Sequence, residues 1–172
     1  MKKNKSGFSL LELLTVIGIV TLMGSVMYAS FSAIRAKERD RKRVSDIRLV
    51  QLALDTYWNK FVNYPASDGN GLGGWDTPGD GTFLAPLVQN GFLPGHMYDS
   101  LVNDSYGNYK YYRFDAGAWP DCDPSKGSYY VLGIVDLETV SSEIVTDDSP
   151  GFACSSYDFQ DDFEWVTGKF QY

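Results

Sequence analysis

The apolar and polar residues divide the chain into an apolar run, an amphipathic stretch and a mixed C-terminal part. From Phe8 to Ile34 the only charged residue is Glu12. This run is longer than the roughly 20 residues that a helix needs to cross the hydrocarbon core of a bilayer. It predicts a transmembrane helix over 8–34, preceded by a short basic leader, residues 1–7.

Beyond Ile34 the apolar residues recur at steps of three and four, which is the period of a helix with one buried face. The predicted buried stripe contains Val44, Ile47, Val50 or Gln51, Leu54, Tyr57 or Trp58 and Phe61. The helix is therefore expected to continue through the basic stretch 35–43 and over 35–62. Pro65 should end it, because proline biases the preceding residue toward extended geometry. Gly18 and Gly24 are its weakest positions.

After Pro65 the sequence predicts short, sequentially local elements. A glycine-rich loop (67–82) and a short helix or turn (83–92) come first. Strands are expected in the Tyr-rich segment NDSYGNYKYYRFDAG, over 128–138, and as a strand or hairpin over 163–172. The expected fold class is α+β: a long N-terminal helix, half transmembrane and half amphipathic, packed on a small antiparallel C-terminal β-sheet.

Charge is distributed unevenly along the chain. Residues 8–60 carry 8 basic and 5 acidic side chains, whereas residues 61–172 carry 4 basic and 17 acidic ones. Binding to nucleic acid requires a basic face, so the acidic part disfavours nucleic acid as a default partner. Residues 35–172 are enough for one modest domain.

Glu12 requires a functional explanation, because a carboxylate in hydrocarbon costs at least about 2.5 kcal/mol. The basic leader, Gly7, Phe8 and Glu12 (KKNKSG followed by FSLLE) resemble the class III signal of type IV pilins and type II secretion pseudopilins. The resemblance implies that a prepilin peptidase cuts between Gly7 and Phe8 and that the Phe8 amine is methylated. It also implies that Glu12 guides assembly by pairing with the N-terminus of a neighbouring subunit. A plain single-pass anchor is the alternative, but it leaves this spacing unexplained.

The distribution of lysine and arginine opposes the orientation that the resemblance implies. Three lysines precede the apolar run and six basic residues follow it between Arg35 and Arg43, so the positive-inside rule alone would place the N-terminus outside. The resemblance implies the reverse, because the peptidase acts on the cytoplasmic side. The expected precursor is a single-pass protein of the cytoplasmic membrane, whose head later forms part of an extracellular filament at the cell surface.

The rest of the chain leaves the subfamily open. The long helix, Tyr64-Pro65, the Tyr-rich strand and YYVLG resemble the major pseudopilin of type II secretion, whereas a C-terminal cysteine pair is typical of type IV major pilins. The main expectation is a type IV pilus subunit. The alternatives are a major pseudopilin, or a membrane-anchored minor pilin acting in adhesion or DNA uptake. A filament of either kind is a homo-oligomer that needs a membrane assembly platform and an ATPase motor.

The remaining candidate residues concern stability and metal binding. Cys122 and Cys154 form an even pair in the extracellular part, which predicts a disulfide, with two unpaired thiols as the alternative. The resemblance implies calcium near Asp136, Asp147 and Asp148. The residues between them are nearly free of glycine, which favours a solvated acidic face over a metal site. No metal, cofactor or enzymatic activity is expected, because the single His96 has no base or nucleophile partner.

Overall fold

The computed structural model describes residues 9–99, 107–139 and 149–172, and for residues 27–30 the backbone alone. Its longest element is α1 (Leu10–Phe61), a helix of 52 residues. It passes through Gly18 and Gly24, the positions expected to be weakest, without a break. The chain divides into two units, residues 1–38 and residues 39–172. We describe each by itself and call residues 39–172 the head.

In the first unit, the apolar side chains of α1 are exposed. Leu10, Leu14 and Leu22 are 83%, 65% and 70% exposed. The segment is long and apolar enough to cross a membrane, and none of its most apolar 18-residue window is buried in the subunit. A helix that is apolar on all sides is stable in a membrane or among other helices, so this segment needs surroundings that one subunit does not supply.

Within the head, α1 buries the predicted stripe, including Val44, Ile47 and Leu54. The prediction was wrong for Phe61, which is 42% exposed. Phe61 is the last residue of α1, and its ring packs at a tilt on the ring of Tyr57, with centroids 4.5 Å apart. The helix ends where Val62 adopts a left-handed conformation (φ 53°) and its N–H bonds to the Trp58 carbonyl at 2.7 Å.

The head contains one antiparallel sheet of three strands in the order β1-β2-β3. They are β1 (Tyr109–Phe114), β2 (Tyr129–Ile134) and β3 (Trp165–Phe170). The second and third strands are shorter than predicted. After Ile134 the backbone N–H groups of 136–139 bond to side chains instead of a neighbouring strand, so the predicted strand 128–138 stops early.

Short helices complete the head. The predicted helix within 83–92 is α2 (Ala85–Gln89). The other short helices of the described residues are 3-10 turns: η1 (Leu72–Gly74), η2 (Pro78–Asp80), η3 (Pro124–Lys126) and η4 (Phe159–Asp161). Two of these turns lie in the segment 67–82, which the sequence analysis expected to be a loop.

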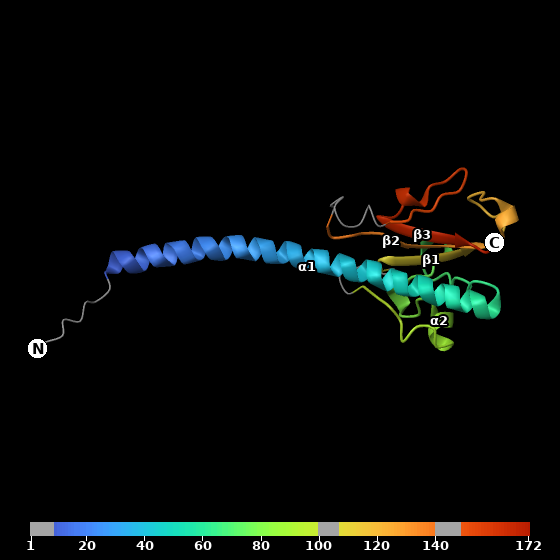
Figure 1. Ribbon diagram of the computed structural model, residues 1–172, viewed down its shortest axis with the longest axis horizontal. Coiled ribbons are helices and arrows are strands. Elements are labelled where there is room, and N and C mark those ends of the chain that lie inside the picture. The colour runs from blue at the N-terminus through green and yellow to red at the C-terminus, as the bar shows by residue number, and fades with distance from the viewer. Residues whose placement is uncertain (1–8, 100–106, 140–148) are drawn as a thin grey trace, which may run out of the picture. The chain divides into compact units, whose positions relative to one another are not determined.

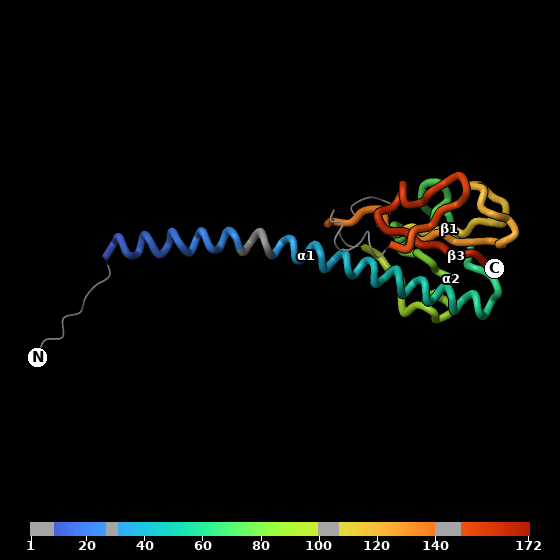
Figure 2. Tube along the Cα trace, turned by 45° about the horizontal axis from the view of Figure 1, so that its top comes forward, coloured from blue at the N-terminus to red at the C-terminus, as the bar shows by residue number. Residues whose placement is uncertain are grey.

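The sheet is buried on both faces, which gives the head three layers (Figures 1 and 2). One face packs against the head part of α1 and against α2, through Tyr111, Leu132 and Trp165 of the sheet. The other face packs against the loops around the sheet, through Val131 and Val166. Alternation along the strands explains this division, because successive side chains point to opposite faces.

Candidate functional site

The first candidate site is the N-terminal end of α1. Gly7 and Phe8 lie outside the described residues, but Ser9 and Glu12 are described. The Ser9 N–H donates to Glu12 Oε2 at 3.0 Å, and the Leu11 N–H donates to Ser9 Oγ at 3.3 Å. This is close to a capping box, except that Ser9 accepts from the second helical residue and not the third; the two side chains satisfy N–H groups that the first turn leaves unpaired.

The sequence analysis missed this cap, although the spacing of Ser9 and Glu12 is its signature. Within one subunit Glu12 therefore stabilises the beginning of its own helix. Farther along, hydroxyl groups bond back to the helix: Thr15 Oγ1 donates to the Glu12 carbonyl at 2.9 Å and Thr21 Oγ1 to the Ile17 carbonyl at 3.0 Å. Such internal bonds let a hydroxyl side chain lie in hydrocarbon at low cost. Glu12 is the only charged residue between Phe8 and Ile34.

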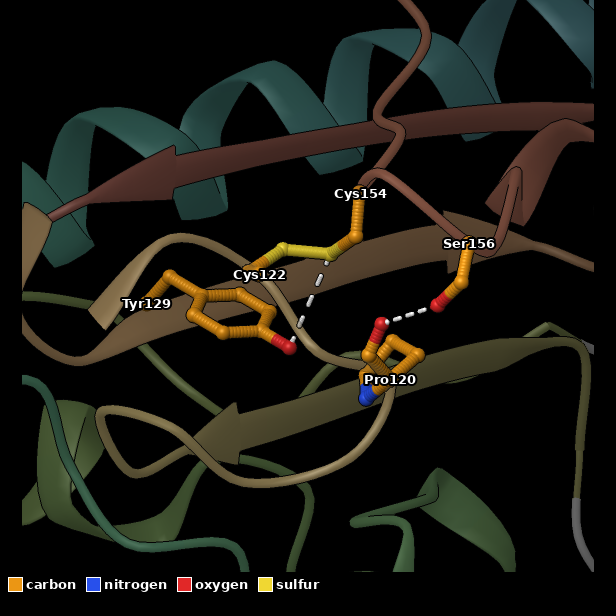
Figure 3. Close-up of a disulfide and its surroundings, with 5 residues drawn as sticks. All are labelled: Pro120, Cys122, Tyr129, Cys154 and Ser156. Atoms are coloured by element: carbon orange, nitrogen blue, oxygen red, sulfur yellow. Dashed lines mark hydrogen bonds between the residues drawn. A yellow bond between two sulfur atoms is a disulfide. The ribbon is translucent and has the colours of Figure 1, made fainter.

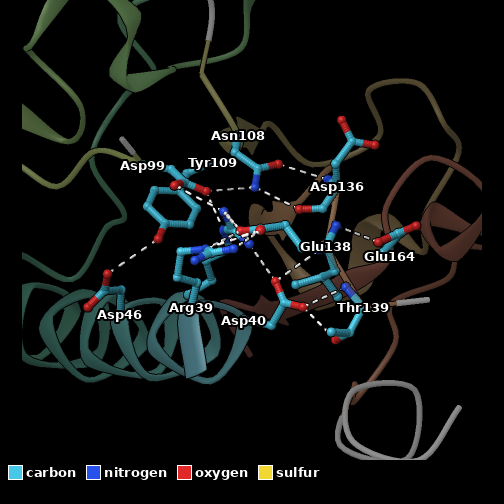
Figure 4. Close-up of polar contacts among 12 residues, drawn as sticks. Arg39, Asp40, Asp46, Asp99, Asn108, Tyr109, Asp136, Glu138, Thr139 and Glu164 are labelled. Atoms are coloured by element: carbon cyan, nitrogen blue, oxygen red, sulfur yellow. Dashed lines mark hydrogen bonds and ion pairs between the residues drawn. The ribbon is translucent and has the colours of Figure 1, made fainter. Parts of the chain in front are cut away.

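The second candidate site is a group of charges in the head, which we call the Arg43 cluster: the buried Asp40, Arg43 and Asp99 and the more exposed Glu138, which also pairs with Arg39. The side chain of Arg43 is 4% exposed and forms ion pairs with all three acids. Its distance to Glu138 Oε1 is 2.8 Å. Asp40 belongs to α1, and Asp99 and Glu138 come from two segments that are far from it and from each other in the sequence (Figure 4).

Asp40 is fully buried and accepts several hydrogen bonds from the segment after β2. Its donors are the Glu138 N–H at 3.0 Å, the Thr139 N–H at 2.8 Å and the Thr139 hydroxyl at 2.5 Å. Burial raises the pKa of Asp40, but the bonds from Thr139, Glu138 and Arg43 outweigh it and hold this pKa below its ordinary value. Burial likewise lowers the pKa of Arg43, and its bonds to Asp99, Glu138 and Asp40 raise it well above the ordinary range.

Asn108 extends the cluster to the beginning of β1. Its amide donates to Asp99 Oδ2 at 3.0 Å and to the Asp136 carbonyl at 2.7 Å, and its Oδ1 accepts from the Asp136 N–H at 2.8 Å. The cluster therefore holds the chain before β1 and the chain after β2 against α1. The sequence analysis correctly continued the helix through 35–43 but did not foresee that Arg43 is buried.

The disulfide predicted between Cys122 and Cys154 is present (Figure 3). It joins the loop after β1 to the segment before β3, and Cys122 is 2% exposed. Beside it the Ser156 hydroxyl donates to the Pro120 carbonyl at 2.8 Å, and the Tyr129 hydroxyl lies 3.8 Å from the Cys154 sulfur. Two long loops are thereby fixed to each other and to β2.

A buried acid in the glycine-rich segment was also missed. Asp76 is 1% exposed, and its carboxylate accepts the Leu84 N–H at 3.2 Å and 3.3 Å. Its backbone pairs with Tyr111 of β1. Burial and then the nearby charge of Asp68 raise the pKa of Asp76 to about 7. The glycines around it gave no sign of this burial, because it follows from the pairing with β1.

The sequence analysis considered metal binding by the acids and a role for His96. Among residues 9–99, 107–139 and 149–172 there is no group of three or more His, Cys, Asp or Glu side chains that could hold a metal. Of the calcium candidates, Asp136 has an exposed side chain, and Asp147 and Asp148 lie outside the described residues. The Nδ1 atom of His96 lies 3.2 Å from the Phe83 carbonyl oxygen, so this ring contacts the backbone of its own head.

Comparison with known proteins gives one match to a short N-terminal motif and several matches to whole proteins. Residues 2–28 match the family model of the prokaryotic N-terminal methylation motif. Three proteins named type II secretion system core protein G are similar over most of their length. The one from Aeromonas hydrophila is 34% identical, covering 62% of this chain and 71% of the relative. Those from Escherichia coli (strain K12) and Dickeya chrysanthemi are 30% and 26% identical, covering 59% and 76% of this chain and 67% and 90% of the relatives. No solved structure matches this chain.

Proposed function

Because the chain belongs to the family of the type II secretion system core protein G, we propose that it is the major pseudopilin of such a system. The observation that supports this most directly is the 34% identity to the Aeromonas hydrophila protein over 71% of that protein's length. The main expectation from the sequence, a type IV pilus subunit, has support only at the level of the wider pilin family, through the N-terminal methylation motif. Members of this family are structural subunits, so the proposed role is mechanical and not enzymatic.

In this proposal the apolar part of α1 anchors the precursor in the cytoplasmic membrane, with the head outside. The peptidase removes residues 1–7, which leaves the Phe8 amine at the N-terminus. The apolar segments then pack together as the core of a filament, where exposed residues such as Leu10 and Leu22 become buried. A membrane assembly platform and an ATPase motor supply the force that extracts the subunit.

Glu12 is the assembly residue of the proposal. Two opposite charges 4 Å apart attract by about 4 kcal/mol at an effective dielectric constant near 20, several times the value in water. A neighbour's Phe8 amine would therefore be a strong partner for Glu12 inside the filament. In the subunit Glu12 caps its own helix through Ser9. Before assembly this bond gives the Glu12 carboxylate a hydrogen-bond partner. In the filament the neighbour's charged amine would replace it.

A surface type IV pilus is the second candidate function. It is favoured by one observation, the disulfide between Cys122 and Cys154, since such a pair is typical of type IV major pilins and not of secretion pseudopilins. Both candidates use the same processing and the same Glu12 contact. They differ in what a cell loses when the subunit is absent.

The experiment is a deletion of the chain in its native cell, complemented by the wild-type chain. We expect loss of secretion of extracellular enzymes, restored by complementation, and a mature N-terminus at methylated Phe8 in mass spectrometry. Intact secretion together with loss of long sheared fibres would replace the pseudopilin with the surface pilus. A mature protein that still begins at Met1 would reject both.

A further inference from the structure

A small pocket, which we call the end pocket, lies where the last turn of α1 meets the end of β3. The amide of Gln171 donates to the Val62 carbonyl at 3.1 Å, so the C-terminal end of the chain lies beside the end of α1 (Figures 1 and 2). The pocket has a volume of about 200 Å³. This is below the roughly 300–1,000 Å³ of most small-molecule sites and suits a single side chain. Its lining includes Asp55, Trp58, Asn59, Lys169, Phe170 and Gln171.

The end pocket combines aromatic rings with groups that form hydrogen bonds. Trp58 and Phe170 are partly buried, and each packs against the core on its own side of the sheet. Lys169 Nζ and Asp55 Oδ1 lie 2.7 Å apart, and these two side chains are 55% and 41% exposed, so both can bind a further partner. A pocket of this kind suits a side chain with an aromatic body and a polar end.

The opposite end of the head presents such a side chain. Tyr98 is 70% exposed. It precedes Asp99, whose carboxylate forms an ion pair with Arg43 of α1 (Figure 4). Trp58 of the end pocket follows Arg43 by 15 residues in the same helix, which is about 22 Å at 1.5 Å per residue. Tyr98 and the end pocket therefore lie at opposite ends of the head.

The other exposed aromatic side chains of the described head lie at the same end as the pocket. They are Phe61, Trp119 and Tyr172. Phe61 is the last residue of α1, and Tyr172 follows β3. Trp119 belongs to the loop between the end of β1 and the beginning of β2, which pair with each other next to the end of β3. A second copy displaced along the direction of α1 would therefore bring Tyr98, and none of these three rings, to the pocket.

We propose that Tyr98 of one copy of this chain inserts into the end pocket of a second copy. The phenol ring packs on Trp58 and Phe170, and its hydroxyl forms hydrogen bonds with Asp55 and Lys169. The inference rests on the proposed function, since the filament is what brings the second copy within reach. It concerns contacts between heads and is separate from the contact at the N-terminal end of α1.

The positions of Tyr98 and the end pocket allow the contact to repeat. Because they lie at opposite ends, one head can insert its Tyr98 into one neighbour and receive the Tyr98 of another. A contact between two different surfaces of identical subunits propagates as an open helix unless its rotation closes a ring. This is the symmetry of a filament, and tyrosine is among the residues that contribute most to binding at protein interfaces. A free small ligand would fill the pocket but would leave Tyr98 exposed.

Photo-crosslinking in intact cells tests the contact directly. A benzophenone amino acid replaces Tyr98 in the full-length chain, which keeps an aromatic ring there and avoids exchange with the native disulfide. We expect a crosslinked dimer whose second peptide contains residues 55–64 or 169–171, mapped by mass spectrometry. The matched control carries the same group at Leu72, which is 69% exposed and does not line the pocket. That control should give no adduct on these residues of a second copy.

Each outcome of the crosslink separates this inference from the proposed function. Adducts at other segments of a second copy, at lipid or only at other proteins would overturn the docking, even in cells whose secretion depends on the chain. The absence of any dimer in such cells would overturn it as well. Adducts on the pocket residues in cells whose secretion is independent of the chain would keep the docking and reject the pseudopilin.

A double-mutant cycle gives a second test that needs no crosslinker. Tyr98→Ala should lower the yield of assembled filament roughly tenfold, as expected for an anchor residue of an interface. Asn59→Trp places an indole at an exposed position of the pocket and should do the same. The two changes together should lower the yield no further than either alone, because both remove the same contact. Leu72→Trp, at an exposed position outside the pocket, is the control and should assemble normally. Losses that multiply in the double variant, or a wild-type yield from Tyr98→Ala, would reject the contact.

Discussion

The two parts of α1 differ in what stabilises them. In the part that belongs to the head, residues such as Ile47 and Leu54 are fully buried against the sheet. In the apolar part, residues such as Leu10 and Leu22 are mostly exposed, although the segment is more apolar. One continuous helix thus contains a segment whose apolar side chains are buried within the subunit. Its other segment needs a membrane or other subunits to bury them.

The contrast extends to the charged residues. Arg43 and Asp40 are buried among partners of their own subunit, and the pKa of Asp40 is held below its ordinary value by bonds that outweigh burial. The Glu12 carboxylate accepts one hydrogen bond, from the Ser9 N–H, and forms no ion pair with a described residue. Substitutions in the head should therefore change folding stability, whereas substitution of Glu12 should change assembly.

Glu12→Ala should have the largest effect. The head should stay folded and the helix should insert, because removing an acid makes the segment more apolar. Assembly should fail or become rare, because the neighbour's Phe8 amine would be buried without its counter-charge, at a cost of several kcal/mol per subunit. The measurement is the yield of assembled filament against subunit retained in the membrane.

Two variants calibrate this result. Glu12→Gln keeps an acceptor without the charge and should be intermediate at best. Ser9→Ala removes part of the cap but keeps Glu12, so its yield should stay close to that of the wild type. Wild-type yield from Glu12→Ala would leave Glu12 as a cap alone and remove the central contact of the assembly model.

Arg43→Met should give the largest loss of folding stability. It leaves the buried acids Asp40 and Asp99 without their cation, while Glu138 keeps Arg39, and breaking a buried ion pair in this way typically costs about 3–5 kcal/mol. Chemical denaturation of the detergent-solubilised full-length chain measures the free energy of unfolding. Lys42→Met, at an exposed position on the same helix, should change it by less than about 0.5 kcal/mol. Equal effects of the two variants would show that the cluster is not what secures the head.

Loss of the disulfide should have a somewhat smaller effect. Cys122 and Cys154 are separated by 32 residues in the chain. Closing a loop of this size contributes about 3–4 kcal/mol in the chain-entropy model. Cys154→Ser should therefore melt earlier in thermal scans, and reduction of the wild type should reproduce that shift. The neighbouring Ser155→Ala is the control, and a melting temperature unchanged by reduction would contradict the prediction.

The smallest effect should appear in the pH dependence, through Asp76. Its pKa is about 7 in the folded head, above its ordinary value near 3.8, so the folded state binds the proton more tightly than the unfolded state. Stability from this group is fully present below its ordinary pKa and is lost as pH rises through about 7. Between about pH 5.5 and about pH 7 the loss should be about 1–2 kcal/mol.

The variant Asp76→Asn should flatten this part of the stability profile, because its side chain does not titrate. Asp161→Asn, at an exposed acid of η4, should leave the slope unchanged. A wild-type profile that is flat over the same range would show that Asp76 is ionised in the folded head at no cost.

The local pattern predicted much of the secondary structure. The period of three and four gave Val44, Ile47 and Leu54 as buried, and the alternation around Tyr109 and Tyr111 gave a strand. The prediction was less accurate where elements end. The strand predicted over 128–138 was too long. After Ile134 the backbone N–H groups donate to the side chains of Asn108 and Asp40, which are both far away in the sequence.

Sequence alone determined the features that depend on neighbours along the chain. The apolar length, the methylation motif with Glu12 at its spacing, the helix over 35–62 and the cysteine pairing could all be predicted because each depends on local order or on a count. Tertiary structure decided that Arg43 and Asp76 are buried and that Trp119 shares a surface with Tyr157. The physical reason is that the burial of a charge depends on partners such as Asp99 and Tyr111, which only folding brings within bonding distance.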